Sequence, residues 1–230
     1  MIPQKLSKGL QTKISMINAA KKLFYQNGYK KTSAKEICEM ANVNHKNFNY
    51  YFKSKDILLT EIYSDLYMKS YSFVESHITY ELNSIEKNTI AAFVYYTGIF
   101  FDESTIRFQK EIYDQHSSTD YMGKNFKHVY NQFFKDLGKE LDPDEINNIR
   151  FAELGLRREL ILRFIENPSN KTIYDVITTM HLYRGRLLQM DENVTKAYLF
   201  NALEFERKHD HSHIHLLVWF LNVIIFLKYK

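Results

Sequence analysis

Polar residues that can donate hydrogen bonds crowd residues 44–50 of this chain, a stretch without a carboxylate. Phe48 and Phe52 lie four residues apart, which places both rings on one face of a helix and predicts that this face is buried. The opposite face presents Asn44, His45, Lys46, Asn47 and Tyr50. Phosphate oxygens and the base edges of a DNA major groove accept the hydrogen bonds that such side chains donate. The residue types therefore predict a DNA-reading surface.

Helix start and stop signals place this stretch in a helix-turn-helix. An apolar periodicity over residues 10–24 predicts a first helix that Gly28 ends. Ser33 and Glu36 have the spacing of a capping box, which predicts a short second helix. Asn44 then caps a short third helix. This arrangement is typical of helix-turn-helix DNA-binding domains, in which the second helix of the motif enters the major groove.

Lys55 follows a capping serine, Ser54, and begins a predicted helix that extends to about residue 78. A positive charge in the first turn opposes the helix dipole, so Lys55 destabilises this helix in isolation. A phosphate group bound at the same helix N-terminus would compensate the unfavourable charge. Lys55 is therefore a candidate phosphate contact.

The pattern over about residues 10–60 resembles the DNA-binding domain of TetR-family repressors. The residues that carry the resemblance are Phe24, Gly28, Tyr29, Thr32, Ser33, Ile37, Ala41, Val43, Phe48, Phe52, Ser54, Lys55 and Leu58. The resemblance implies a homodimer that binds a palindromic operator in double-stranded DNA and is released by a small-molecule effector. It also implies phosphate contacts at Ser33 and Lys55. The recognition-helix contacts that it implies are Asn44, His45, Lys46, Asn47 and Tyr50.

Three residues depart from the family pattern. Lys46 stands where the family usually has glycine, Asn47 where it has threonine or serine, and Asn49 where it often has tyrosine. Lys46 adds a long cation, and Asn49 lacks an aromatic contact to phosphate. The resemblance therefore implies DNA binding but does not carry over an operator sequence.

Turn-forming residues are scarce, with 7 Gly and 3 Pro among 230 residues. Sheet proteins need such residues at every chain reversal, so we expect an all-α protein. Residues 1–60 contain eleven lysines and three acidic residues, a net charge of +8, whereas residues 61–230 carry −4. A polyanionic partner is therefore expected for the basic part. We place a DNA-binding domain at residues 1–56 and a helical regulatory and dimerisation domain at residues 57–230.

Helix signals continue through the second domain without a linker or an internal repeat. The predicted helices cover residues 55–78, 84–101, 104–113, 119–138, 142–166, 172–189, 193–208 and 211–227. Ser104 is the expected cap of its helix. Asp142 and Pro143 are the clearest start, because they combine a capping carboxylate with a proline in the first turn.

Aromatic residues concentrate in the middle helices and suggest an effector pocket for an apolar or cationic organic molecule. The candidates are Phe93, Tyr96, Phe100, Phe108, Tyr113 and Tyr130, with Arg107, Arg157, Arg158 and His181 as candidate polar groups. Ordinary core packing would produce the same pattern, so both interpretations stay open.

Alternating histidines precede an apolar run near the C-terminus. On a helix, His209 and His213 form one pair four residues apart, and His211 and His215 form another. Two imidazoles at this spacing can bind a transition metal, but no third ligand is evident, so a solvated hinge is the alternative. Residues 216–227 are apolar on every side and too short to span a bilayer. We therefore expect them to be buried in a homodimer interface.

Other functions find little support in the sequence. Cys38 is the single cysteine, which excludes an intramolecular disulfide and suits a reducing cytoplasm. The first residues lack the apolar segment of a signal peptide, so we expect a cytoplasmic protein with no membrane partner. No catalytic motif is present, and no cofactor is predicted. The open alternatives are a metal-responsive regulator, an α-helical enzyme with a vestigial DNA-binding module, and a structural DNA organiser.

Overall fold

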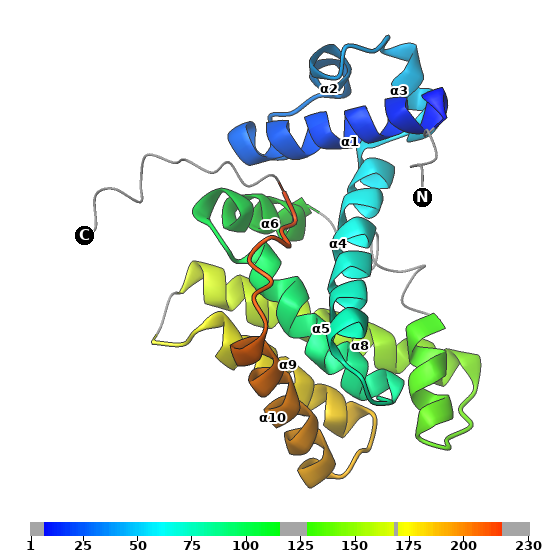
Figure 1. Ribbon diagram of the computed structural model, residues 1–230, viewed down its shortest axis with the longest axis vertical. Coiled ribbons are helices and arrows are strands. Elements are labelled where there is room, and N and C mark those ends of the chain that lie inside the picture. Colours follow the sequence, from blue (N-terminus) through cyan, green and yellow to red (C-terminus); the bar gives the residue numbers. More distant parts are fainter. Residues whose placement is uncertain (1–6, 116–127, 168–169, 218–230) are drawn as a thin grey trace.

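The structure, a computed structural model, describes residues 7–115, 128–167 and 170–217, and every regular element in this part of the chain is a helix (Figure 1). The helices are α1 (Lys8–Asn27), α2 (Ala34–Met40), α3 (Lys46–Tyr51), α4 (Lys55–His77), α5 (Ser84–Ile99), α6 (Glu103–Gln115), α8 (Pro143–Glu166), α9 (Ile173–Leu187) and α10 (Glu192–Lys208). Residues 128–136 are helical as well. The all-α prediction is confirmed.

Side-chain caps begin α2, α4 and α8 at the residues that the sequence predicts: Ser33, Ser54 and Asp142. The Ser33 hydroxyl accepts from the Glu36 amide, and the Glu36 carboxylate accepts from the Ser33 amide, which completes the capping box of α2. Asp142 caps α8 through the amides of Asp144 and Glu145. Each such cap stabilises its helix by about 0.5–2 kcal/mol.

The start of α6 differs from the prediction. Asp102, rather than Ser104, supplies the cap, because its carboxylate accepts from the Thr105 amide at 3.0 Å. The helix therefore starts at Glu103 and extends to Gln115. Aspartate and serine are about equally good caps, so two candidates this close in sequence cannot be ranked by residue type.

The helices form two parts joined by α4 (Figure 1). At one end of the molecule, α2 and α3 pack on α1. From there α4 extends into a larger part that we call the helical body, residues 84–217, where α5 packs against α4, α9 and α10. Twelve of the 16 residues of α5 are buried. One apolar cluster extends from Phe24 and Phe52 in the small part to Phe205 in the helical body.

Residues 211–217, the described part of the helix that we predicted over residues 211–227, are not helical. Residues 209–217 form turns, bends and irregular backbone instead. The Leu216 amide donates to the Gly98 carbonyl at 3.1 Å, and a Cβ on Gly98 would lie 2.6 Å from the Ile214 carbonyl oxygen. Backbone packs on backbone here, which requires glycine at position 98.

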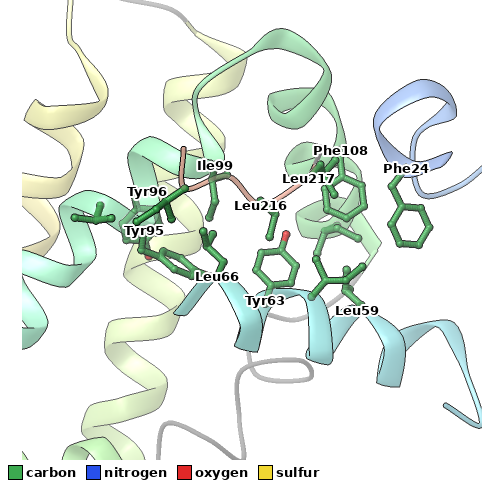
Figure 2. Packing of buried hydrophobic residues seen from close by; sticks show 14 of the residues in the cluster. Phe24, Leu59, Tyr63, Leu66, Tyr95, Tyr96, Ile99, Phe108, Leu216 and Leu217 are labelled. Atoms are coloured by element: carbon green, nitrogen blue, oxygen red, sulfur yellow. The ribbon is translucent and has the colours of Figure 1, made fainter. Parts of the chain in front are cut away.

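Leu216 and Leu217 lie among side chains of α4, α5 and α6 (Figure 2). Both are buried by their own chain, so the predicted intersubunit surface cannot begin at Leu216. The remainder of the apolar run, residues 218–227, lies outside the described residues, as do the first residues of the helix predicted over 119–138. Among the described helices, none is long and apolar enough to cross a membrane.

Candidate nucleic-acid interface

Two phenylalanines and a tight turn hold α3 in place. Phe48 and Phe52 are buried, with ring centroids 5.6 Å apart, as their spacing predicts. Asn42 adopts a left-handed conformation with φ of 53° in the turn between α2 and α3, and asparagine tolerates this conformation better than most residues. The Val43 amide then donates to the Cys38 carbonyl at 2.9 Å, which ties the turn to α2.

The outward face of α3 carries the predicted DNA-reading residues. Asn44, His45, Lys46 and Tyr50 are exposed, and Asn47 is partly exposed. The Asn44 side chain accepts from the Lys46 amide at 2.9 Å, but the helix begins one residue later than predicted, with His45 rather than Asn44 as its N-cap. Tyr50 is 80% exposed, which leaves its ring and hydroxyl available to a partner.

Lys55 has a structural role that the sequence did not reveal. Its ammonium group donates to the carbonyls of Tyr29 at 3.0 Å and Thr32 at 2.8 Å, and it lies 4.1 Å from the centre of the Tyr29 ring. The Tyr29 hydroxyl donates to Asp56 at 2.6 Å. These contacts explain a lysine in the first turn of α4 without any phosphate. Burial lowers the pKa of Lys55, whereas Asp56 and other nearby carboxylates raise it.

Ser33 is also engaged within the domain. Its hydroxyl donates to the Glu36 carboxylate at 2.7 Å. The hydrogen bonds from Ser33 hold the pKa of the Glu36 carboxyl below its usual value, so a negative charge stands beside Ser33. A phosphate contact at Ser33 therefore requires a rearrangement of this pair.

The lysines of the basic part do not all face solvent. Lys13 pairs with Glu61 at 2.8 Å, and Lys21 pairs with Asp65 at 2.6 Å, so these two lysines fasten α1 to α4. Four others have exposed side chains in the loop before α2 and on or beside α3: Lys30, Lys31, Lys46 and Lys53. The net charge of residues 1–60 does not show which lysines are neutralised by acidic residues of α4. The folded structure identifies Lys13 and Lys21 as those lysines.

The small part of the molecule is similar in sequence to known proteins. Residues 16–62 match the family model described as bacterial regulatory proteins, tetR family. Over these residues the chain is similar to the DNA-binding domain of TetR-family regulators. A stretch of 58 residues is 40% identical to the probable HTH-type transcriptional regulator YttP of Bacillus subtilis (strain 168). This match spans 25% of the chain and 28% of that relative.

Solved structures resemble most of the chain. RolR in complex with the ligand resorcinol has a TM-score of 0.54 at 14% identity, over 84% of this chain and 94% of that chain. A tetR-family transcriptional regulator from Streptomyces coelicolor has a TM-score of 0.50 at 13% identity, over 85% of this chain and 89% of that chain. At such identities the likeness shows the fold, a helix-turn-helix domain followed by a larger helical domain.

Helix α6 connects the TetR domain, residues 16–62, to the helical body. The Arg107 guanidinium donates to the carbonyl of Tyr25 at 2.8 Å, near the C-terminus of α1. Glu111 accepts from the Lys30 amide at 2.9 Å. On its other side α6 contacts α8, because the Arg158 guanidinium donates to the Tyr113 carbonyl at 2.7 Å. Two of the polar residues noted in the sequence therefore serve this connection.

Of the six aromatic pocket candidates, the structure brings one to a cavity. A small cavity of about 20 Å³ in the helical body is lined by Tyr67, Tyr71, Asn88, Ala91, Ala92, Tyr95, Tyr96 and Arg157. The other five candidates pack elsewhere in the core: Phe93 near Tyr174, Phe100 on Phe164, Phe108 on Phe24, Tyr113 beside α8 and Tyr130 against Glu153. The sequence missed Tyr67, Tyr71 and Asn88 because they lie on α4 and early in α5, away from the aromatic concentration.

The four C-terminal histidines do not form the predicted pairs. Because residues 209–217 are not helical, the spacing of four residues does not bring the imidazoles together. The ring of His209 packs against Phe205, and His211 contacts the Glu206 carboxylate at 2.7 Å. The rings of His213 and His215 pack against Phe73 and Phe101 respectively. No group of three potential metal ligands occurs among the described residues. This arrangement does not support the metal-responsive alternative.

Proposed function

We propose that this protein is a TetR-type transcriptional regulator that binds a palindromic DNA operator as a homodimer. The outward face of α3 carries the proposal: it combines amide, imidazole, ammonium and phenol groups, contains no carboxylate, and lies at an end of the molecule (Figure 1). Asn44, His45, Lys46, Asn47 and Tyr50 are the proposed base and phosphate contacts. The match of residues 16–62 to the TetR family supports this assignment.

Phosphate contacts at Ser33 and Lys55 remain part of the proposal, with the qualification that both side chains already have partners in the domain. Ser33, whose amide donates to Glu36, and Lys55 lie at the start of α2 and α4, where helix dipoles favour an anion. Lys30, Lys31, Lys46 and Lys53 would add sequence-independent attraction to the DNA backbone. The division into residues 1–56 and 57–230 stays a proposal as well, since α4 crosses this boundary without a break.

A dimer is needed because one short helix makes too few contacts for specific affinity. Two α3 helices held about one DNA turn apart, roughly 34–36 Å, read two half-sites at once. Exposed apolar side chains on the last helices offer a surface for this dimer, with Phe200 on α10 and Tyr183 on α9 the largest. We propose that a small-molecule effector bound in the helical body changes the spacing of the two domains through α4 and α6.

Sequencing of duplexes selected from a random pool by the full chain tests this function. The expected sequences contain two inverted half-sites whose centres lie about 10 base pairs apart or a multiple of that distance. The same selection with Asn47→Ala is expected to relax the preference at one or two base pairs per half-site, and Lys139→Ala, remote from α3 in the helical body, serves as the control. Random sequences in the selected pool would contradict the proposal and favour a structural DNA organiser.

A further inference from the structure

Two arginines carry positive charge into the interior of the helical body. Arg157 on α8 donates from Nε to Glu153 at 2.7 Å and from Nη1 to the Tyr96 hydroxyl at 3.2 Å. Arg184 on α9 donates to the side chains of Asn88 and Thr89, both on α5. A guanidinium group stays ionised in proteins, so both charges are present.

One buried carboxylate faces these two cations. Glu153 pairs with Arg157 and also accepts from the Tyr130 hydroxyl. The partners of Arg184 in the described residues are neutral, and the ring of Phe133 lies 5.4 Å from its guanidinium carbon. Arg157, Arg184 and Glu153 together therefore carry one positive charge more than they carry negative charges. A buried unbalanced charge is destabilising, and an anion that enters the same region would balance it.

The small cavity lies beside this excess charge. Its lining offers the Arg157 guanidinium, the Asn88 amide and tyrosine hydroxyls, and it contains no carboxylate. Arg184 fixes the orientation of Asn88 by donating to its amide oxygen, so the amide nitrogen points the other way and donates to the Tyr71 hydroxyl at 2.6 Å. Hydrogen-bond donors thus face the cavity on one side. Ala91 and Ala92 supply an apolar wall.

A larger groove adjoins the cavity across a tyrosine wall. Tyr67 and Tyr71 line the cavity of about 20 Å³ and also the open groove of about 470 Å³. Their ring centroids lie 4.5 Å apart. Both side chains are partly exposed. Rotation of these two rings toward the groove would join the two spaces and admit a ring-sized molecule.

We propose that this cavity binds a small organic anion, a planar carboxylate whose charged group faces Arg157 and Asn88 and whose apolar part lies among Ala91, Ala92 and the tyrosine rings. The excess positive charge disfavours the cationic ligand that the aromatic composition alone allowed. This inference rests on the proposed function only in taking the anion as the effector that changes DNA binding. The binding site itself can be tested without DNA.

Calorimetric titration of the full chain with three matched probes tests the charge preference. Benzoate, benzamide and benzylammonium have the same ring and nearly the same size, but they carry charges of −1, 0 and +1. Benzoate is expected to bind at least about tenfold more tightly than benzamide, because its hydrogen bonds are to an ionised group. Benzylammonium is expected to bind more weakly still. Equal binding of the three probes, or no binding of benzoate at millimolar concentration, would overturn the proposal.

The source of the excess charge is tested with Arg184→Met. This substitution removes the cation and leaves only neutral groups behind, so the variant is expected to fold. Arg184 acts through Asn88 as a positioning residue and through its charge, so the benzoate-to-benzamide affinity ratio is expected to fall toward one. Arg186→Met changes an exposed arginine on the same helix and is expected to leave the ratio unchanged. A ratio that survives in Arg184→Met would show that its charge does not determine binding.

The ion pair at the cavity wall gives a second test that does not depend on Arg184→Met. The double variant Glu153→Gln/Arg157→Gln removes both charges of the pair, so neither partner is left as an unpaired buried charge. It is expected to weaken benzoate binding about tenfold or more. Glu159→Gln/Arg163→Gln is the matched control, an exposed pair on α8 with the same spacing of four residues. Unchanged benzoate affinity in the first double variant would place the anion elsewhere.

Titration of the selected operator with and without benzoate separates this inference from the proposed function. Benzoate binding that leaves operator affinity unchanged would support the anion-binding site but contradict its role as the effector site. Normal operator binding without any benzoate binding would contradict the site alone and leave the proposed DNA-binding function intact.

Discussion

Lys55 joins the α1–α2 turn to the start of α4, and its substitution separates structural from DNA-binding effects. Lys55→Ala removes two hydrogen bonds to carbonyl oxygens and the contact with the Tyr29 ring. We expect the free energy of unfolding to fall by about 1–2 kcal/mol, since the ammonium is partly exposed. Urea denaturation measures this loss. The exposed neighbour Lys53 gives the control, because Lys53→Ala removes the same charge without these contacts.

The DNA contribution of Lys55 is measured by the salt dependence of duplex binding. If the ammonium also contacts a phosphate, Lys55→Ala lowers the slope of log affinity against log salt concentration by about one. A lower stability with an unchanged slope would show that Lys55 is a structural residue and does not contact phosphate.

His181 is a buried imidazole with 1% of its surface exposed, and among the described residues neither ring nitrogen has a hydrogen-bond partner. Burial, followed by the charges of Arg184 and Arg157, lowers the pKa of His181 well below its usual value. Below about pH 6.5 the unfolded chain takes up a proton at this residue and the folded chain does not. Stability is therefore lost as the pH falls, by about 1.4 kcal/mol per pH unit from this residue.

Urea denaturation between pH 7 and pH 5 tests the His181 prediction. His181→Leu removes the titrating group and is expected to flatten the decline of stability with falling pH relative to the parent. His128→Gln changes an exposed histidine and serves as the control. Parallel curves for His181→Leu and the parent would show that this imidazole is protonated in both states or in neither.

At the scale of elements, α6 is the connection whose disruption should separate effector binding from DNA binding. Arg107→Ala removes the contact of α6 with the C-terminal carbonyls of α1. We expect operator affinity in the absence of benzoate to stay nearly unchanged, because α6 does not carry the DNA-reading face. The weakening of operator binding by benzoate is expected to shrink, since less coupling passes from the helical body to α1.

Fluorescence anisotropy titrations of the operator with and without benzoate measure this coupling. Arg163→Ala alters an exposed arginine on α8 and should keep the full effect. A full benzoate effect in Arg107→Ala would place the coupling in α4 alone.

The elements that the sequence predicts well are those determined by neighbouring residues. The capping box of Ser33 and Glu36 and the cap at Asp142 depend on residues two or three positions away, so their patterns are visible in the sequence. The segment after α10 depends instead on Gly98, which is distant in sequence and offers the backbone that Leu216 contacts. Its alternating histidines and apolar residues look helical, and this tertiary contact overrides that pattern.

The candidate sites divide in the same way. The outward face of α3 follows from helical periodicity, and the sequence therefore predicted its residues. The proposed anion site is formed by residues of α4, α5, α8 and α9. These helices are distant from one another in the sequence, so no local sequence pattern predicts that they meet. One local signal was present: Glu153 and Arg157 lie four residues apart and share a helix face with the buried Leu154 and Ile161 as neighbours. A charged pair beside buried residues indicates a polar interior.

At the scale of the whole molecule, the proposed function requires a dimer, because one α3 helix makes too few contacts for specific DNA binding. Phe200 on α10 is 63% exposed, which is unusual for a large aromatic side chain unless a partner covers it. Phe200→Asp would place a charge in that interface, and we expect the variant to sediment as a monomer and lose operator binding. Tyr80→Asp is the matched control, because Tyr80 is 62% exposed in the loop between α4 and α5.

A Phe200→Asp variant that remains dimeric would place the interface elsewhere. The double variant Val218→Asp/Ile224→Asp then tests the apolar run predicted from the sequence, whose residues 218–227 lie outside the described part of the chain. Tyr183 on α9 and Phe151 on α8, each 45% exposed, are the next aromatic residues to substitute.

The central claim is that α3 reads DNA sequence, and one measurement tests it most directly. The affinity of the full chain for a selected palindromic duplex is compared with its affinity for the same duplex with both half-sites shuffled, at the same salt concentration. We predict that the palindrome is bound at least about a thousandfold more tightly, and that His45→Ala/Asn47→Ala removes most of this preference. Equal affinity of the unmodified chain for the two duplexes would contradict the account.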